Sequence, residues 1–180
     1  MRLVPLRAAI VMASIYGYFL IFAQFSFVEL LRNDYAFRPL ASLSAGTHEK
    51  VLLGAMALAG ILAGFWTAWK GATPVKIRIA LFIAAIASFV APWAGSGLPL
   101  LLISLLTGIG VGVSTVSVAA LLRSWCGLLW AGLGTGLGYA CCNLPFIFSQ
   151  SPAHQAWIAT GFAGLGALCV PRRREISWNV

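Results

Sequence analysis

A series of long apolar runs, separated by short polar or basic segments, constrains this chain more than any other feature. A helix that crosses the hydrocarbon core of a bilayer needs about 20 mostly apolar residues. In lipid, its backbone polar groups must be paired within the segment, which makes the segment helical. The runs therefore predict six membrane-spanning helices, with bounds near 8–31, 51–69, 77–93, 98–122, 128–148 and 156–170.

The composition excludes a soluble domain of this length. Only 9% of the 180 residues are charged and 61% are hydrophobic, whereas soluble domains carry about 25% charged and about 45–50% apolar residues. A domain of this size has too much surface for its volume to hide that much apolar area from water. We therefore expect a single all-α, polytopic membrane domain over residues 1–180, with the lipid bilayer as its surroundings.

The first apolar run follows Arg2 and Arg7, as the core of a signal peptide would. The run is too long for such a core, and it lacks a small-residue cleavage site. We expect it to be retained as the first span.

The basic residues predict the orientation in the membrane. Lys and Arg are enriched in cytoplasmic loops, and nine of the twelve lie on one side if the N-terminus is cytoplasmic. These nine are Arg2, Arg7, Lys70, Lys76, Arg78, Arg123, Arg172, Arg173 and Arg174. We expect both termini in the cytoplasm of a bacterium, with the chain in the cytoplasmic (inner) membrane. Nucleic acid is not expected as a partner, because no basic patch with exposed aromatic residues is left once the spans are removed.

The cysteines and histidines do not form a metal-binding pattern. The four cysteines make no CxxC pair, and the two histidines, His48 and His154, lie far apart in predicted outer loops. A metal site needs converging ligands, so we expect no metal, no cofactor and no disulfide framework. An intramembrane protease of rhomboid type would need a Ser and a His facing each other inside the membrane. Both histidines fall outside the spans, so an enzyme is not expected.

Glycines recur at a spacing of four in the second, fourth and fifth spans. The pairs are Gly60–Gly64, Gly108–Gly112, Gly132–Gly136 and Gly134–Gly138. In lipid this spacing lets helix backbones approach closely. Two interpretations stay open, namely simple helix packing and a face that slides during transport. Both predict close packing of the fourth and fifth spans against their neighbours.

Polar side chains form stripes at helical spacing in three spans. The first span carries Ser14, Tyr18, Ser26 and Glu29; the fourth carries Ser104, Thr107, Ser114 and Ser117; the fifth carries Thr135, Tyr139 and Cys142, with Asn143 beside them. Such groups form hydrogen bonds between helices, worth about 0.6–2 kcal/mol each, or line a path for a small molecule. The candidates for a path are Tyr18, Ser26, Glu29, Ser114, Ser117, Tyr139 and Asn143. Among them, Glu29 is the candidate proton or cation group.

The stretch GFWTAWKG, from Gly64 to Gly71, occupies the predicted cytoplasmic loop between the second and third spans. Transporters of the major facilitator superfamily carry the signature G-x-x-x-D-R/K-x-G-R/K-R/K in this loop, and Gly64 and Gly71 keep its spacing. The chain has a longer outer first loop, a glycine-rich fourth span that ends in Arg123, and a glycine-rich fifth span, GLGTGLGYACCNLP. In these features it resembles one six-helix half of such a transporter.

The loop also departs from the signature. Ala68 stands at the position of the acid and Trp69 at that of the first base, while Lys70, Lys76 and Arg78 keep the loop basic. In the family the charges of this loop help to lock the two halves in one conformation. The resemblance implies a gating loop built from Gly64, Lys70, Gly71, Lys76 and Arg78. An ordinary turn bounded by glycines is the alternative.

The resemblance implies half of a secondary transporter. Such transporters place the substrate between two six-span halves, so this chain would work as a homodimer or with a second six-span chain. The alternative is a non-transporting scaffold, accessory or assembly subunit of a larger membrane complex. The scarcity of ionisable residues and the lost signature charges favour that alternative.

Overall fold

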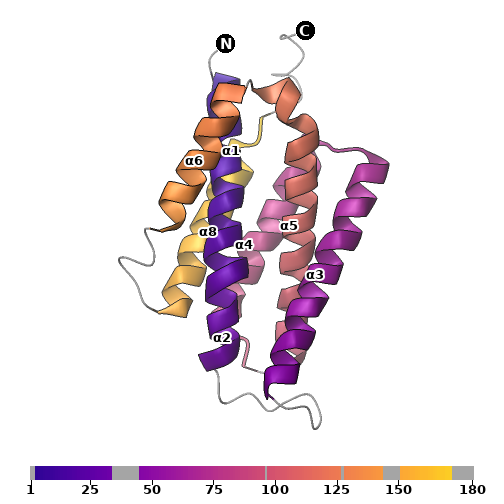
Figure 1. The fold of residues 1–180 in the computed structure, drawn as a ribbon, viewed down its shortest axis with the longest axis vertical. Coiled ribbons are helices and arrows are strands. Elements are labelled where there is room, and N and C mark those ends of the chain that lie inside the picture. Colours follow the sequence, from indigo (N-terminus) through magenta and orange to yellow (C-terminus); the bar gives the residue numbers. More distant parts are fainter. Residues whose placement is uncertain (1–2, 34–44, 96, 127, 144–150, 172–180) are drawn as a thin grey trace.

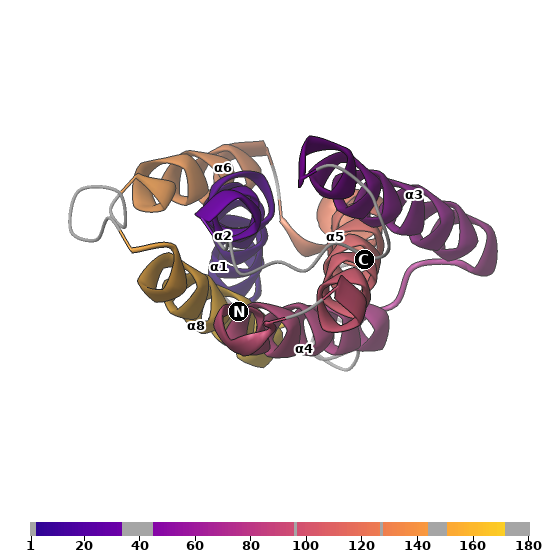
Figure 2. The same ribbon diagram turned by 90° about the horizontal axis from the view of Figure 1, so that it is seen from below.

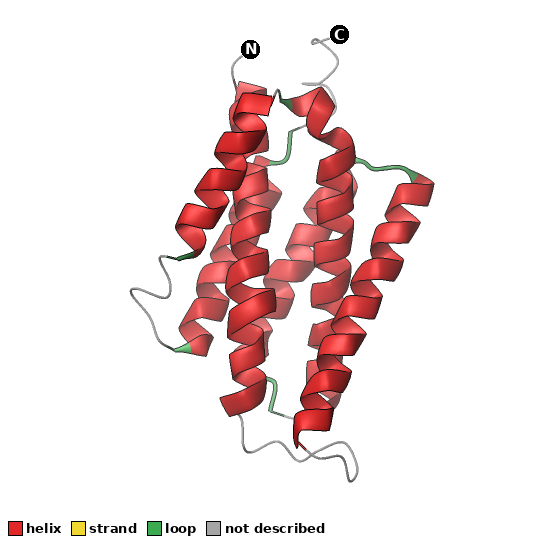
Figure 3. Ribbon diagram, viewed as in Figure 1, coloured by secondary structure: helices red, strands yellow, loops and turns green. Residues whose placement is uncertain are grey.

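The computed structural model describes residues 3–33, 45–95, 97–126, 128–143 and 151–171. Within these ranges the chain is all-α and has no strand (Figure 3). The elements are α1 (Leu3–Tyr18), η1 (Phe19–Ser26), α2 (Phe27–Asn33), α3 (Ala45–Lys70), α4 (Pro74–Val90), η2 (Ala91–Trp93), α5 (Gly97–Trp125), α6 (Leu128–Cys142) and α8 (Pro152–Cys169). The fold class predicted from the apolar runs is confirmed as all-α.

Four helical segments of the described residues are long and apolar enough to cross a membrane. They are Leu3–Arg32, Thr47–Lys70, Pro74–Trp93 and Gly97–Leu122, and they coincide with the first four predicted spans. The fifth predicted span is represented by α6, which is apolar but only 15 residues long; residues 144–148 lie outside the described part. The sixth corresponds to α8, which starts before residue 156 because Pro152 and the polar His154 and Gln155 form its first turn.

The first span departs from a uniform α-helix. After Tyr18 the chain makes a π-helix of eight residues, η1, and then returns to α-geometry in α2. Residues four positions apart advance by slightly more than one turn of an α-helix, which has 3.6 residues per turn, and by slightly less than one turn of the wider π-helix. The rotation of these side chains around the helix axis in α1 is therefore reversed in η1. As a result, Ser14, Tyr18, Phe22 and Ser26 stay buried on one face. This confirms the predicted stripe as far as Ser26, whereas Glu29 is exposed.

The helices alternate in direction, and the start of α1 and the end of α8 lie at the same end of the bundle (Figure 1). Arg7, Lys70, Lys76 and Arg78 lie on segments at this end, which we call the basic end. At the opposite end, Arg32 Nε of α2 donates to Glu49 Oε1 of α3 at 3.2 Å. That ion pair is mostly exposed and therefore contributes little stability.

The packing has an internal order. The closest pairs of helices are α3 with α5, α1 with α6, α4 with α5, α4 with α8, and α1 with α8. If α1, α3 and α4 are exchanged in order with α5, α6 and α8, each of these close pairs becomes another close pair of the same list or stays the same. Since α1 and α5 run in opposite directions (Figure 1), the two sets of three helices, which we call the three-helix units, are inverted relative to each other, and all five of the closest pairs join one unit to the other.

Glycines make the closest helix crossings. A Cβ added at Gly108 would overlap the carbonyl oxygen of Met56, and one at Gly112 would overlap that of Gly60. The pair α1 with α6, which corresponds to α3 with α5 under this exchange, is also held by a glycine contact. A Cβ at Gly134 would lie 2.7 Å from the carbonyl oxygen of Ala9. The predicted close packing of the fourth and fifth spans is confirmed. Of the overlapping motifs in α6, only Gly134–Gly138 touches a neighbour; Gly132 and Gly136 face open space.

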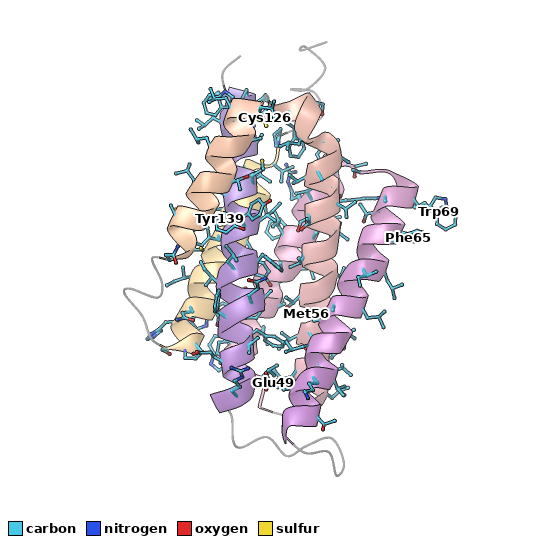
Figure 4. All side chains as sticks on the ribbon, in the orientation of Figure 1. Glu49, Met56, Phe65, Trp69, Cys126 and Tyr139 are labelled. Carbon is cyan, nitrogen blue, oxygen red and sulfur yellow. The ribbon has the colours of Figure 1, made fainter. Side chains whose placement is uncertain are left out.

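The outer surface carries large apolar side chains, as expected for contact with lipid. Phe65 and Trp69 of α3 point away from the bundle (Figure 4) and are 69% and 75% exposed. Among the four long apolar segments, the one in α3 is the least buried, with 17% of its apolar window inside the structure against 61% for the first. Helix α3 is thus attached to the bundle almost entirely through α5.

The glycine crossing predicts a position-specific effect of an added methyl group. Gly112→Ala forces a Cβ into the carbonyl of Gly60, so we expect it to lower the free energy of unfolding by about 1–3 kcal/mol. The control Gly132→Ala has open space around it and should be neutral, or stabilising by up to about 1 kcal/mol. Denaturant unfolding in mild detergent measures both. Equal effects of the two substitutions would contradict the packing described.

Candidate functional site

A cavity of about 640 Å³ lies between α1, α3 and α5. Seen along the bundle (Figure 2), α3 and α5 stand on one side of it and α1 with η1 on the other. Helices α4, α6 and α8 contribute no residue to its lining. Its walls include Tyr16, Phe19, Met56, Ala57, Thr115 and Ala119.

The lining of the cavity is almost entirely apolar. Among the residues that the structure describes, no charged side chain lines it, and its hydroxyl groups come from Tyr16 and Thr115. Its volume falls within the range of pockets that bind small molecules, about 300–1,000 Å³. The chemistry available is apolar contact with one or two hydrogen bonds, which suits an uncharged molecule and offers nothing to neutralise an ion.

None of the seven predicted path residues lines this cavity. Tyr18, Ser26, Ser114 and Ser117 are buried between helices, and Glu29, Tyr139 and Asn143 are exposed. A role of any of the seven in transport stays a prediction.

Three of these residues form local hydrogen bonds. Ser26 Oγ donates to the carbonyl of Pro152 at 2.7 Å, which ties η1 to the start of α8. Ser114 Oγ donates to the carbonyl of Gly110 at 2.6 Å, and Asn143 Nδ2 donates to that of Tyr139 at 2.9 Å. Tyr139 does not line the cavity but contacts Tyr16, which does. The two ring centroids are 5.7 Å apart.

The sequence did not predict that α3 forms a wall of the cavity. The prediction followed polar stripes, and α3 has none in its apolar part. The available signal was the run of small and flexible residues Met56, Ala57 and Gly60, which leave space beside the crossing with α5.

Four hydroxyl groups meet in the middle of the bundle, from Tyr18, Ser88, Thr107 and Thr160. We call them the hydroxyl cluster. Ser88 Oγ and Thr160 Oγ1 are 2.9 Å apart, and the Tyr18 hydroxyl faces those of Thr107 and Ser88. The Tyr18 and Thr107 oxygens are fully buried but make no hydrogen bond of good geometry. Sequence stripes identified Tyr18 and Thr107, while Ser88 and Thr160 were missed because each stands alone in its helix.

The predicted gating loop forms a compact turn at the basic end. Gly71 has φ of +82°, a left-handed conformation that favours glycine, and it terminates α3. Thr73 caps α4 by accepting the backbone N–H of Lys76 at 3.3 Å. Lys76 Nζ donates to the carbonyl of Gly71 at 2.7 Å and lies 4.6 Å from the centroid of the Trp66 ring. Three of the five predicted residues, Lys70, Gly71 and Lys76, thus belong to the turn itself.

The other two predicted loop residues contact other helices. Gly64 packs against Val116 of α5. Arg78 donates from Nε to the carbonyl of Ala167 at 3.3 Å and from Nη2 to that of Val170 at 3.2 Å. Arg7 Nε binds the neighbouring carbonyl of Cys169 at 3.2 Å. The last carbonyls of a helix lack partners within the helix and carry partial negative charge, so both guanidinium groups stabilise the end of α8.

The described residues contain no group of three or more His, Cys, Asp or Glu that could hold a metal ion. No protein-family model, curated protein or solved structure matches the chain.

The capping of α8 predicts that Arg78 matters for stability. Arg78→Gln removes the charge and at least one of two hydrogen bonds to carbonyls. We expect the free energy of unfolding to fall by about 1–2 kcal/mol. Lys70→Gln is the control, because Lys70 is exposed and only lies 5.4 Å from the Trp69 ring; its effect should stay below roughly 0.5 kcal/mol. A larger loss for Lys70→Gln than for Arg78→Gln in detergent unfolding would refute the assignment.

Proposed function

We propose that this chain is a half-size secondary transporter of major-facilitator type that works as a homodimer. The supporting observation is the position of the cavity in an inverted bundle. It is lined by α1 and α5, the first helices of the two three-helix units, together with α3. Transporters built from inverted repeats place the substrate site where the repeats meet.

The lining of the cavity supports an uncharged and largely apolar substrate. Tyr16 and Thr115 can bind one polar group of such a molecule, while Met12, Phe19 and Met56 contact its apolar part. A charged substrate would lose its hydration without gaining a counter-charge, which is strongly unfavourable.

Two copies are proposed because one bundle supplies only one side of the path. The cavity is bounded by three helices, and α3 is poorly buried along its length. A second copy related by a two-fold axis would present the same surface in return, so that two cavities face each other. Alternating access would then be a rocking of one copy against the other.

The charge distribution supports an orientation for this assembly. Arg7, Lys70, Lys76 and Arg78 lie at the basic end, and cytoplasmic segments carry an excess of Lys and Arg. We place this end, with both termini, in the cytoplasm of a bacterium, and the bundle in the inner membrane.

The main alternative is an accessory or assembly subunit that does not transport. Lys76 and Arg78 bind carbonyl groups within this chain, and the loop from Gly64 to Gly71 has no acid. The loop therefore lacks the acid that would help lock two transporter halves. Stable co-purification with a larger, unrelated membrane complex would favour this alternative.

Transport is tested by filling the cavity. Ala57→Trp places a large ring into the cavity, so counterflow of labelled, uncharged, mostly apolar compounds in proteoliposomes should fall to the level of empty liposomes. Its neighbour Leu58 is exposed and does not line the cavity. Leu58→Trp should therefore leave counterflow unchanged.

A panel of such compounds is screened first with the unmodified chain. The absence of counterflow for every compound, or equal counterflow in the two tryptophan variants, would contradict the proposal. Far-ultraviolet circular dichroism checks that both variants remain folded.

A further inference from the structure

Two arginine side chains meet at the basic end, where α1, α4 and α8 come together. Arg7 of α1 and Arg78 of α4 both donate from Nη2 to the carbonyl oxygen of Val170, at 3.5 Å and 3.2 Å. The two nitrogen atoms can therefore be no farther apart than the sum of these distances. We call the two side chains the arginine pair. Neither of them lines the cavity, and α4 and α8 contribute nothing to its walls, so the pair is a separate feature.

The positive charge of the pair is not balanced within the described residues. A guanidinium group is always charged, and two of them at this separation repel each other. The carbonyl groups at the end of α8 offer only partial negative charges. The carboxylate side chains among the described residues, Glu29 and Glu49, lie on segments at the opposite end of the bundle (Figure 1). The arrangement therefore favours the binding of an anion.

The pair also has the donors that such an anion needs. A guanidinium group carries five N–H donors, and Arg78 binds the carbonyls of α8 through Nε and Nη2. In the part of the chain that the structure describes, no acceptor binds its Nη1. Both arginines are half-buried, so part of each side chain can be reached from the surface. A phosphate group can accept two parallel hydrogen bonds from a guanidinium group.

The surface beside the pair indicates that the anion carries apolar chains. Ile79 and Phe82 follow Arg78 along α4, and both are exposed. On α8, Leu165 and Leu168 are exposed as well. A free phosphate ion gains nothing from these side chains, whereas the acyl chains of a phospholipid can lie along them while its headgroup stays at the basic end. An anionic phospholipid therefore fits both the charge and the apolar surface.

We propose that the arginine pair binds the phosphate headgroup of an anionic phospholipid in the leaflet at the basic end. The phosphate lies against the two guanidinium groups, and the acyl chains follow the exposed apolar side chains of α4 and α8. Basic pockets between spans on the cytoplasmic side of a membrane bind such headgroups. The bound phosphate links α1 to α4 beside the end of α8, and it supplies the negative charge that the carbonyls there cannot.

The proposal is tested by the lipid dependence of thermal unfolding. The purified chain, freed of native lipid in mild detergent, is heated with dioleoyl phosphatidylglycerol, dioleoyl phosphatidylcholine or inorganic phosphate at equal concentrations. A ligand that binds only the folded state raises the unfolding midpoint in a saturable way. We expect phosphatidylglycerol to raise it by roughly 5 °C over phosphatidylcholine at about a hundredfold excess over its dissociation constant. Inorganic phosphate should leave the midpoint unchanged.

Two outcomes would overturn the proposal. Equal midpoints with the two lipids would show that the negative charge of the lipid is not recognised. If Glu175→Gln then lowers the midpoint, the carboxylate of Glu175, which lies outside the described residues, is the partner of the pair. An equal rise with inorganic phosphate and phosphatidylglycerol would show that the site binds a phosphate ion and not a lipid.

Variants locate the effect. Arg7→Gln and Arg78→Gln each remove one charge of the pair, so each should reduce the rise of the midpoint with phosphatidylglycerol over phosphatidylcholine. A role in capping α8 alone would lower the midpoint equally with both lipids and keep that difference. Lys70→Gln is the control, because it removes the same charge at the same end and Lys70 is exposed at the end of α3. Its difference should match that of the unmodified chain.

The site is refuted if the difference between the two lipids survives both arginine variants. It is also refuted if Lys70→Gln reduces the difference as much as they do, because the lipid would then respond to the total charge only. These measurements need neither a transported substrate nor a second copy. A chain that binds the lipid but shows no counterflow would keep this site and lose the transport function. A chain that transports with equal midpoints in the two lipids would do the reverse.

Discussion

The contact between the backbones of α3 and α5 determines the rest of the candidate site. Lipid offers no hydrophobic force that drives helices together, so close packing at small residues must hold them. Gly60, Gly108 and Gly112 allow this approach, and α3 has hardly any other attachment to the bundle. Helix α3 forms one wall of the cavity. The cavity therefore depends on the glycine crossing, which holds α3 against α5 although the rest of α3 is largely exposed.

The opposite side of the bundle is held by different interactions. Arg7 and Arg78 bind the terminal carbonyls of α8 at the basic end, and Ser26 binds the first turn of α8 near the other end. Between them, Ser88 and Thr160 join α4 to α8. Polar contacts at both ends of α8 and between them fix it to α1, η1 and α4, whereas α3 is held mainly by glycine packing against α5, with one exposed ion pair from Arg32 to Glu49. Helix α3, which has few polar contacts, lines the cavity, and α8, which has several, does not.

The sequence predicted those features that depend on the apolar length and on simple periodicity. Four helices that are long and apolar enough to cross a membrane, the buried stripe from Ser14 to Ser26 and the close packing at Gly108 and Gly134 follow from such patterns, and they are confirmed. The sequence did not predict the cavity, because the residues of an apolar cavity wall show no pattern that distinguishes them from residues that face lipid. The contacts of Arg78 with α8 and of Ser88 with Thr160 join residues 72 to 92 positions apart, so no local pattern encodes them.

The central claim is that two copies meet across the cavity, and site-directed disulfide cross-linking in native membranes tests it most directly. Single cysteines are placed in a cysteine-free variant by Ile61→Cys or by Ile86→Cys. Ile61 lines the cavity and is 68% exposed, while Ile86 of α4 is 60% exposed and lies outside it. The account predicts an oxidised dimer for Ile61→Cys and none for Ile86→Cys. A dimer formed only through Ile86→Cys, or no dimer with either, would contradict the homodimer.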